Sequence, residues 1–284
     1  MHARAGTAAR SADRVFLIGV SRALGGAVIF GLPLLMTMEM WEIAFYIPPL
    51  RLGALVALSL PMLVFLSYYS GFRETTRLRD DVLDAFVALA LGAVASAIVL
   101  LLVGAITRET SAADAVGKIA LQTVPASIGA LLADDQLGGE SRREEHEEKL
   151  GDGGPGYLAE LALMSVGALF LGFNVAPTEE IVLIQYRLDA WQILLLVLAS
   201  VAVMHAFVYA VEFHGQEKHP EHVGPSEAFL RFTIVGYVAA LLTSAFVLWV
   251  FGRFDGVPFA EAVQAIVVLG FPAAVGAAAA RLLL

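Results

Sequence analysis

Long apolar segments alternate with shorter polar segments along this chain of 284 residues. An α-helix needs about 20 mainly apolar residues to cross a hydrocarbon core of about 30 Å. None of the apolar segments shows the two-residue alternation of a membrane β-barrel, so we expect helices. The pattern predicts an all-α polytopic membrane protein with eight transmembrane helices, near residues 16–36, 52–70, 83–106, 115–133, 157–176, 190–211, 230–252 and 262–281.

The last four predicted helices correspond to the first four, in the same order. At an offset of 147, Ala113–Ala133 matches Ala260–Ala280 with nine identities, including Pro125 with Pro272. Span 1 and the positions of Tyr68 and Phe72 recur at an offset of 141, and span 3 recurs at an offset of 148. Because four is an even number, both copies would cross the membrane in the same direction. The sequence therefore predicts a tandem parallel repeat of four plus four helices.

The segment between the two copies, residues 134–156, is acidic and rich in glycine, so it cannot bury a core. We expect a cytoplasmic N-terminal tail (1–15), the first repeat (16–133), this acidic cytoplasmic linker (134–156) and the second repeat (157–284). Lys and Arg number about twelve on the side of the termini and linker and about five on the other. The positive-inside rule thus predicts a multi-pass protein of a prokaryotic inner membrane with both termini in the cytoplasm.

Composition narrows the possible functions. The chain is 58% hydrophobic and only 16% charged, with a mean hydropathy of +0.76, which is too apolar for a soluble domain. It has no cysteine, which excludes disulfides and thiolate metal sites, and its net charge of −9 argues against nucleic acid partners. We find no metalloprotease, serine hydrolase or phosphate-binding signature, so we expect neither an enzyme nor a cofactor.

The most informative segment is Gly167–Ile184, GALFLGFNVAPTEEIVLI, which interrupts an apolar run with Pro177 and two adjacent acids. A similar segment, Gly26–Ile43, reads GAVIFGLPLLMTMEMWEI and lies 141 residues earlier. Acids inside an apolar envelope usually face a cavity, a partner or an ion. The recurrence is asymmetric, because the first copy has Met36 and Met38 where the second has Pro177 and Glu179.

Two interpretations of this segment stay open. In the first, carboxylate, hydroxyl and amide oxygens of both copies converge on a cation or proton site made of Glu39, Glu179, Glu180, Thr37, Thr178 and Asn174. In the second, the segment only starts a helix, with acids in a first turn that favours negative charge. Three prolines are predicted to break or kink helices (Pro177, Pro125 and Pro272), and His205 in span 6 is a candidate proton relay. The identity of any metal is open.

With GALFLGFNVAPTEEI in view, the sequence resembles an uncharacterised prokaryotic family of integral membrane proteins, a domain of unknown function whose recognisable core is the APTEE segment. The resemblance covers nearly the whole chain. It implies a polytopic inner-membrane protein, and it carries no activity, cofactor or catalytic residue.

The leading hypothesis is a cation-handling ion channel or secondary transporter, with the bilayer and an inorganic cation or proton as partners. The alternative is a non-transporting membrane scaffold, sensor or accessory subunit, and an intramembrane lipid enzyme is a third hypothesis. Small two-fold channels often pair, which favours a homo-oligomer. No motif that we recognise identifies the ion or distinguishes a channel from a carrier.

Overall fold

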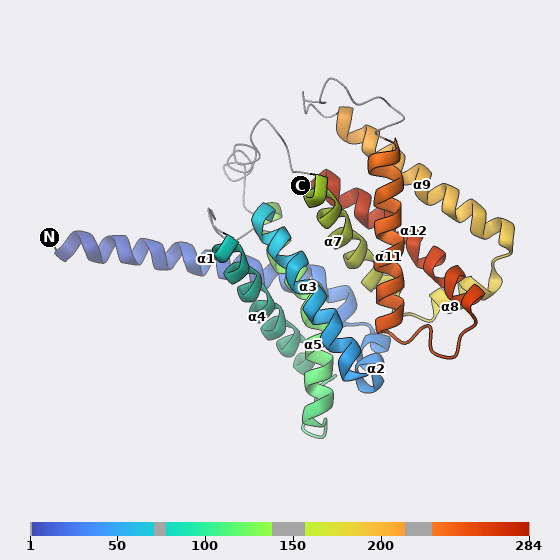
Figure 1. Cartoon of the computed structure of the whole chain (residues 1–284). Helices are drawn as coiled ribbons and strands as arrows, with labels where there is room; N and C mark the ends of the chain where they lie inside the picture. The colour runs from blue at the N-terminus through green and yellow to red at the C-terminus, as the bar shows by residue number, and fades with distance from the viewer. Residues whose placement is uncertain (1, 71–77, 138–156, 214–228, 284) are drawn as a thin grey trace.

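The computed structural model describes residues 2–70, 78–137, 157–213 and 229–283, and every regular element in these ranges is a helix. Eight of the described helices are long and apolar enough to cross a membrane, which confirms the all-α fold and the eight spans. Seven of these spans lie within single α-helices, and the eighth combines a π-helix with the α-helix that follows it (Figure 1). The elements are α1 (His2–Leu35), α2 (Met38–Tyr46), α3 (Pro49–Ser70), α4 (Leu78–Leu102), α5 (Ala112–Leu137), α7 (Tyr157–Val175), α8 (Glu180–Arg187), α9 (Ala190–Phe213), η2 (Phe229–Ile234), α11 (Val235–Val250) and α12 (Phe259–Leu283).

The helix boundaries follow the hydropathy pattern to within a few residues, except at the N-terminus. There α1 begins at His2 and runs unbroken into the first span, so the segment predicted as a tail is helical in its backbone and projects beyond the other helices (Figure 1). Most of the predicted linker, 138–156, lies outside the described residues, and α5 extends to Leu137. The predicted domain boundaries stay predictions.

Glycines set the closest helix approaches in each half. In the first half α1 packs on α5, where a Cβ on Gly26 would overlap the carbonyl oxygen of Gly129 and the side chain of Ala133. In the second half α7 packs on α12, where a Cβ on Gly167 would overlap the carbonyl oxygen of Gly276 and the side chain of Ala280. Small residues of this kind let membrane helices approach backbone to backbone.

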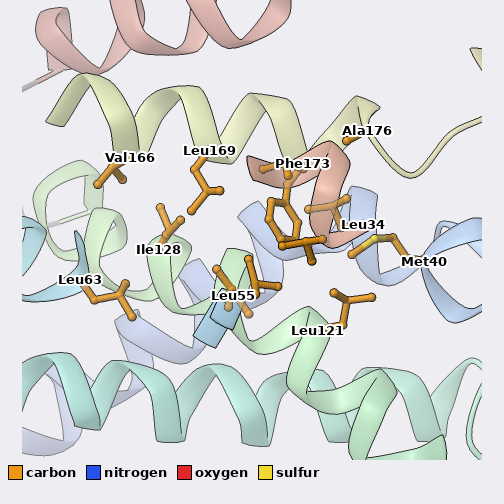
Figure 2. Close-up of a cluster of buried hydrophobic side chains, with 14 of the residues drawn as sticks. Leu34, Met40, Leu55, Leu63, Leu121, Ile128, Val166, Leu169, Phe173 and Ala176 are labelled. Atoms are coloured by element: carbon orange, nitrogen blue, oxygen red, sulfur yellow. The ribbon is translucent and has the colours of Figure 1, made fainter. Parts of the chain in front are cut away.

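The two halves share one apolar core. Leu34, Leu55 and Leu121 of the first half and Leu169 and Phe173 of the second belong to the same buried cluster (Figure 2). Phe30 of α1 meets Phe170 of α7 edge to face, with ring centroids 6.0 Å apart. The halves are therefore packed as one body around α3, α5, α7 and α11.

One end of the bundle gathers the loops 36–48, 103–111, 176–189 and 251–258, together with the short helices α2 and α8; we call it the break face (Figure 1). Two of these loops have a glycine in the left-handed region as their second residue, Gly104 (φ 75°) after α4 and Gly252 (φ 71°) after α11. A residue with a Cβ is strained in that conformation, so glycine is required there to end the helix. The opposite end holds the C-terminus and the starts of α4, α7 and η2, and we call it the terminal face.

Candidate functional site

The APTEE segment forms a turn between α7 and α8. The helix α7 ends at Val175, and the turn is closed by backbone hydrogen bonds from Ala176 to Gly172 (2.8 Å) and from Thr178 to Val175 (3.1 Å). The Thr178 hydroxyl also donates to the Val175 carbonyl (2.7 Å), and the Asn174 amide donates to the Phe170 carbonyl (2.8 Å). The polar donors of the motif are thus used on backbone carbonyls of the last two turns of α7.

Arg253, in the loop after α11, completes this turn. Its guanidinium donates to the carbonyl oxygens of Pro177 and Thr178, the latter at 3.3 Å, and pairs with the Glu179 carboxylate at 3.2 Å. Only 18% of the Arg253 side chain is exposed, whereas 68% of the Glu179 side chain is. Arg253 therefore acts as a cationic cap on the turn, and Glu179 is the counter-ion on its outer side.

Glu180 lies in the first turn of α8, with its side chain exposed. A hydrogen bond from its own backbone N–H lowers the pKa of the Glu180 carboxyl below its ordinary value. The nearby Thr178 hydroxyl acts in the same direction, although its proton is already donated to the Val175 carbonyl. An ionised acid in this position also faces the positive end of the α8 dipole.

The first break, between α1 and α2, is capped by neutral groups. The Gln122 amide of α5 donates to the Leu34 carbonyl (2.8 Å), and the Trp41 indole N–H donates to the Leu35 carbonyl (2.9 Å). Thr37 is the N-cap residue of α2, and its hydroxyl donates back to the Pro33 carbonyl. Glu39 follows in the first turn of α2, half-buried. Here too the polar side chains bond the carbonyls at the end of a span.

The structure places all six predicted ligands at the break face. Five of them lie beyond the ends of the predicted spans, and Asn174 lies in the last turn of α7. Glu39 lies on α2, which packs on α5, whereas Glu179 pairs with Arg253 and Glu180 lies on α8, which packs on α12. Among the described residues no three His, Asp or Glu side chains are grouped closely enough to hold a metal ion.

The other predicted residues are placed as follows. Pro177 lies in the turn between α7 and α8, while α5 and α12 continue through Pro125 and Pro272, so neither of these prolines ends its helix. A proline inside a helix still leaves the carbonyl four residues earlier without its usual donor. His205 lies in α9, far from the acidic turns along the helix, and its Nδ1 is 3.1 Å from the Thr233 hydroxyl.

Sequence reasoning missed two groups of residues. Arg253 and Gln122 are the caps of the two breaks, but they lie 76 and 88 residues from the carbonyls that they bond, so no local pattern points to them. Asp81 and Asp84 are each only 2% exposed and lie one turn apart in α4, where both take part in interactions. Two acids spaced i, i+3 at the start of an apolar span were a signal that could have found this pair.

The eight apolar spans and their shared core define a polytopic helical membrane protein. Residues 19–284 match the family model described as "Putative integral membrane protein (DUF2391)", and the chain therefore belongs to this family. The resemblance expected from the sequence is confirmed at the level of the family. No curated protein and no solved structure matches the chain.

Proposed function

We propose that this protein is a non-enzymatic membrane scaffold or accessory subunit, in which the two acidic breaks fold and hold one membrane face. The observation that carries the proposal is the use of polar donors at the breaks. Thr37, Asn174 and Thr178 each donate to a carbonyl of the helix that has just ended, and Arg253 caps the second turn. Glu179 is already paired with Arg253, and Glu180 is hydrogen-bonded by its own N–H.

The test compares stability with transport. Glu180→Ala should lower the Tm of the purified protein, because the first turn of α8 loses its acidic cap, whereas Glu42→Ala on the exposed side of α2 should not. Proteoliposomes of the unaltered protein should show no more Na⁺, K⁺, Ca²⁺, Mg²⁺ or proton flux than empty liposomes. A cation flux that Glu180→Ala abolishes at unchanged Tm would overturn the proposal.

Cation handling is a second candidate function, and one observation favours it. The three glutamates lie at the same face, Glu39 is half-buried, and the lowered pKa of Glu180 keeps its carboxylate ionised. Carboxylates gathered at one membrane face attract cations and raise their local concentration. If Glu39→Gln combined with Glu180→Gln left a measured flux unchanged, this candidate would be lost.

The predicted repeat and orientation belong to the same proposal. Equivalent glycine contacts, Gly26 with Gly129 and Gly167 with Gly276, support a parallel four-plus-four arrangement, and so do the left-handed glycines after α4 and α11. The excess of Lys and Arg at the terminal face supports an inner-membrane protein with cytoplasmic termini.

The orientation can be measured directly, because the chain has no cysteine of its own. Glu109→Cys at the break face should react with an impermeant maleimide on intact cells. Arg79→Cys, at the start of α4 on the terminal face, should react only after lysis. The reverse result would invert the orientation.

A further inference from the structure

A row of polar side chains crosses the interface between α9 and the η2–α11 helix. His205 Nδ1 lies 3.1 Å from the Thr233 hydroxyl, and Thr233 has no exposed surface. About one turn further into the bundle, Tyr237 of α11 lies near Ser200 of α9. We call these four residues the polar row. Tyr237 is eight residues from the start of the span, about 12 Å along the helix, so the row reaches close to the middle of a hydrocarbon core of about 30 Å.

The inner end of the row contains a buried hydroxyl that lies near Ser200 without forming a hydrogen bond of good geometry. Tyr237 is 6% exposed, and its hydroxyl makes no hydrogen bond of acceptable geometry to any residue that the structure describes. Ser200, its polar neighbour, donates to the Leu196 carbonyl (2.8 Å). The surrounding cluster is apolar and includes Met164, Met204 and several alanines. A buried hydroxyl without a hydrogen bond of good geometry is costly, so the site favours a small polar occupant.

The first half has apolar residues at three of the four positions that correspond to the polar row. At the sequence offsets of the predicted repeat, Tyr237, Thr233 and His205 correspond to Leu89, Ala85 and Val64. Ser200 corresponds to Ser59, which is also a buried serine. Leu89 and Val64 pack against the first-half core, and Ala85 is fully buried in it. Three of the four positions of the polar row are thus apolar in the first half, so helix packing alone does not require Tyr237, Thr233 and His205.

The outer end of the row lies at an irregular backbone segment. η2 is a π-helix, a geometry that is rare and frequent at functional sites. The Tyr157 hydroxyl of α7 donates to the carbonyl of Arg231 in η2 (3.0 Å). The Phe229 ring of η2 packs edge to face against His205, with ring centroids 5.0 Å apart. The π-helix thereby holds Thr233 and His205 where α9 and η2 approach the terminal face.

We propose that the polar row is a hydrated path from the terminal face to the middle of the bilayer, with ordered water bound between Tyr237 and Ser200. Water supplies both the donor and the acceptor that these hydroxyls lack. Rows of hydroxyl and imidazole groups with water are also the means by which protons enter membrane proteins. The proposal stands apart from the acidic breaks and from the scaffold function.

The sign of a stability change tests whether the site is occupied. Tyr237→Phe removes only the hydroxyl. If water bridges Tyr237 and Ser200, the variant loses a hydrogen bond and its Tm falls by about 2–4 °C. If the hydroxyl is unsatisfied and the site is dry, the same change raises Tm or leaves it unchanged, which overturns the proposal. Tyr46→Phe, on an exposed tyrosine of α2, is the matched control and should change nothing.

Radiolytic hydroxyl-radical labelling tests the water directly, because side chains beside bound water are modified even when they are buried. Tyr237 should be labelled severalfold faster than Phe173, which is 1% exposed in the apolar core. Thr233→Val keeps the side-chain shape but should lower the labelling of Tyr237 severalfold, since it interrupts the path. Labelling of Tyr237 at the rate of Phe173, or unchanged by Thr233→Val, overturns the hydrated path.

Discussion

The breaks after α1 and after α7 both lie at the break face but are capped by different chemistry. At the first break, the Gln122 amide and the Trp41 indole bond the carbonyls of Leu34 and Leu35. At the second break, the Arg253 guanidinium bonds the carbonyls of Pro177 and Thr178. Both solutions bond backbone oxygens at a break, at the end of α1 with neutral donors and in the turn after α7 with a cation.

This difference accounts for the asymmetry of the acids. A cation with only 18% of its side chain exposed requires a counter-ion, and Glu179 supplies it at 3.2 Å. The first break has neutral caps, and Met38 stands where Glu179 does in the second. The acids that the two halves share, Glu39 and Glu180, are those in the first turns of α2 and α8, where the helix dipole favours negative charge.

The largest expected effects concern the close glycine contacts between helices, which both halves contain. Gly26→Ala and Gly167→Ala each place a methyl group on the backbone of the facing helix, so neither contact can relax by moving a side chain alone. Each should destabilise the protein by about 3 kcal/mol, measured by thermal unfolding in detergent.

Neighbouring glycines provide the control. Gly25→Ala and Gly172→Ala meet nothing within 4 Å and replace glycine by a better helix former, so they should be neutral or slightly stabilising. A tolerated Gly167→Ala beside a damaging Gly26→Ala would show that the two halves do not pack alike.

The next effect should separate the two breaks. Arg253→Met leaves the carbonyls of Pro177 and Thr178 without their donor and should cost about 2 kcal/mol of stability. Gln122→Met, of similar shape, should be nearly neutral. The Leu34 carbonyl keeps its bond from the Thr37 N–H, and the change also removes the buried Gln122 Oε1, which has no hydrogen-bond partner. Equal losses in the two variants would contradict the distinction between a cationic and a neutral cap.

The fold could be predicted from the sequence because it depends on a repeated local property. Each span needs only enough apolar residues to cross the bilayer, and hydropathy alone gave all eight. The turn at Pro177 could be predicted for the same reason, since proline and two acids inside an apolar run interrupt a helix locally.

The geometry of the candidate site could not be predicted, because its partners are distant in sequence. Nothing beside the APTEE segment indicates that Arg253 would bond it, and nothing beside Leu34 indicates Gln122. Acids in an apolar run were interpreted as candidate ligands, since sequence does not separate an acid that binds an ion from one that pairs with a buried arginine. Only the placement of the α11–α12 loop against the turn distinguishes these alternatives for Glu179.

A smaller effect should come from the acid that both halves share. The pKa of Glu180 is lowered in the folded state, so its contribution to stability is present above the ordinary carboxyl pKa and is lost as pH falls through the folded value. Glu180→Gln should therefore lower Tm at pH 7, and the difference from the unaltered protein should shrink when both are measured below about pH 4. A difference that does not depend on pH would show that shape, not charge, matters in the first turn of α8.

The smallest effect is expected where the break face joins the halves. Arg51 of α3 donates two hydrogen bonds to Asp255 (2.7 Å each) and lies over the Trp249 ring at 5.4 Å, and the Arg51 guanidinium lowers the pKa of Asp255. Because 62% of the Asp255 side chain is exposed, salt screens this pair. Asp255→Asn should lower Tm less than Arg253→Met does.

The difference in Tm between Asp255→Asn and the unaltered protein should become smaller as NaCl is raised from about 0.1 M to about 1 M, because the Debye length falls from about 10 Å to about 3 Å. Glu109→Gln in the exposed 103–111 loop is the control for general salt effects. If Asp255→Asn instead matched Arg253→Met at all salt concentrations, the Arg51 pair would stabilise the contact between the halves as strongly as the cap stabilises the turn. The second break would then depend on α3 of the first half as much as on Arg253, because Asp255 and Arg253 lie two residues apart in one loop.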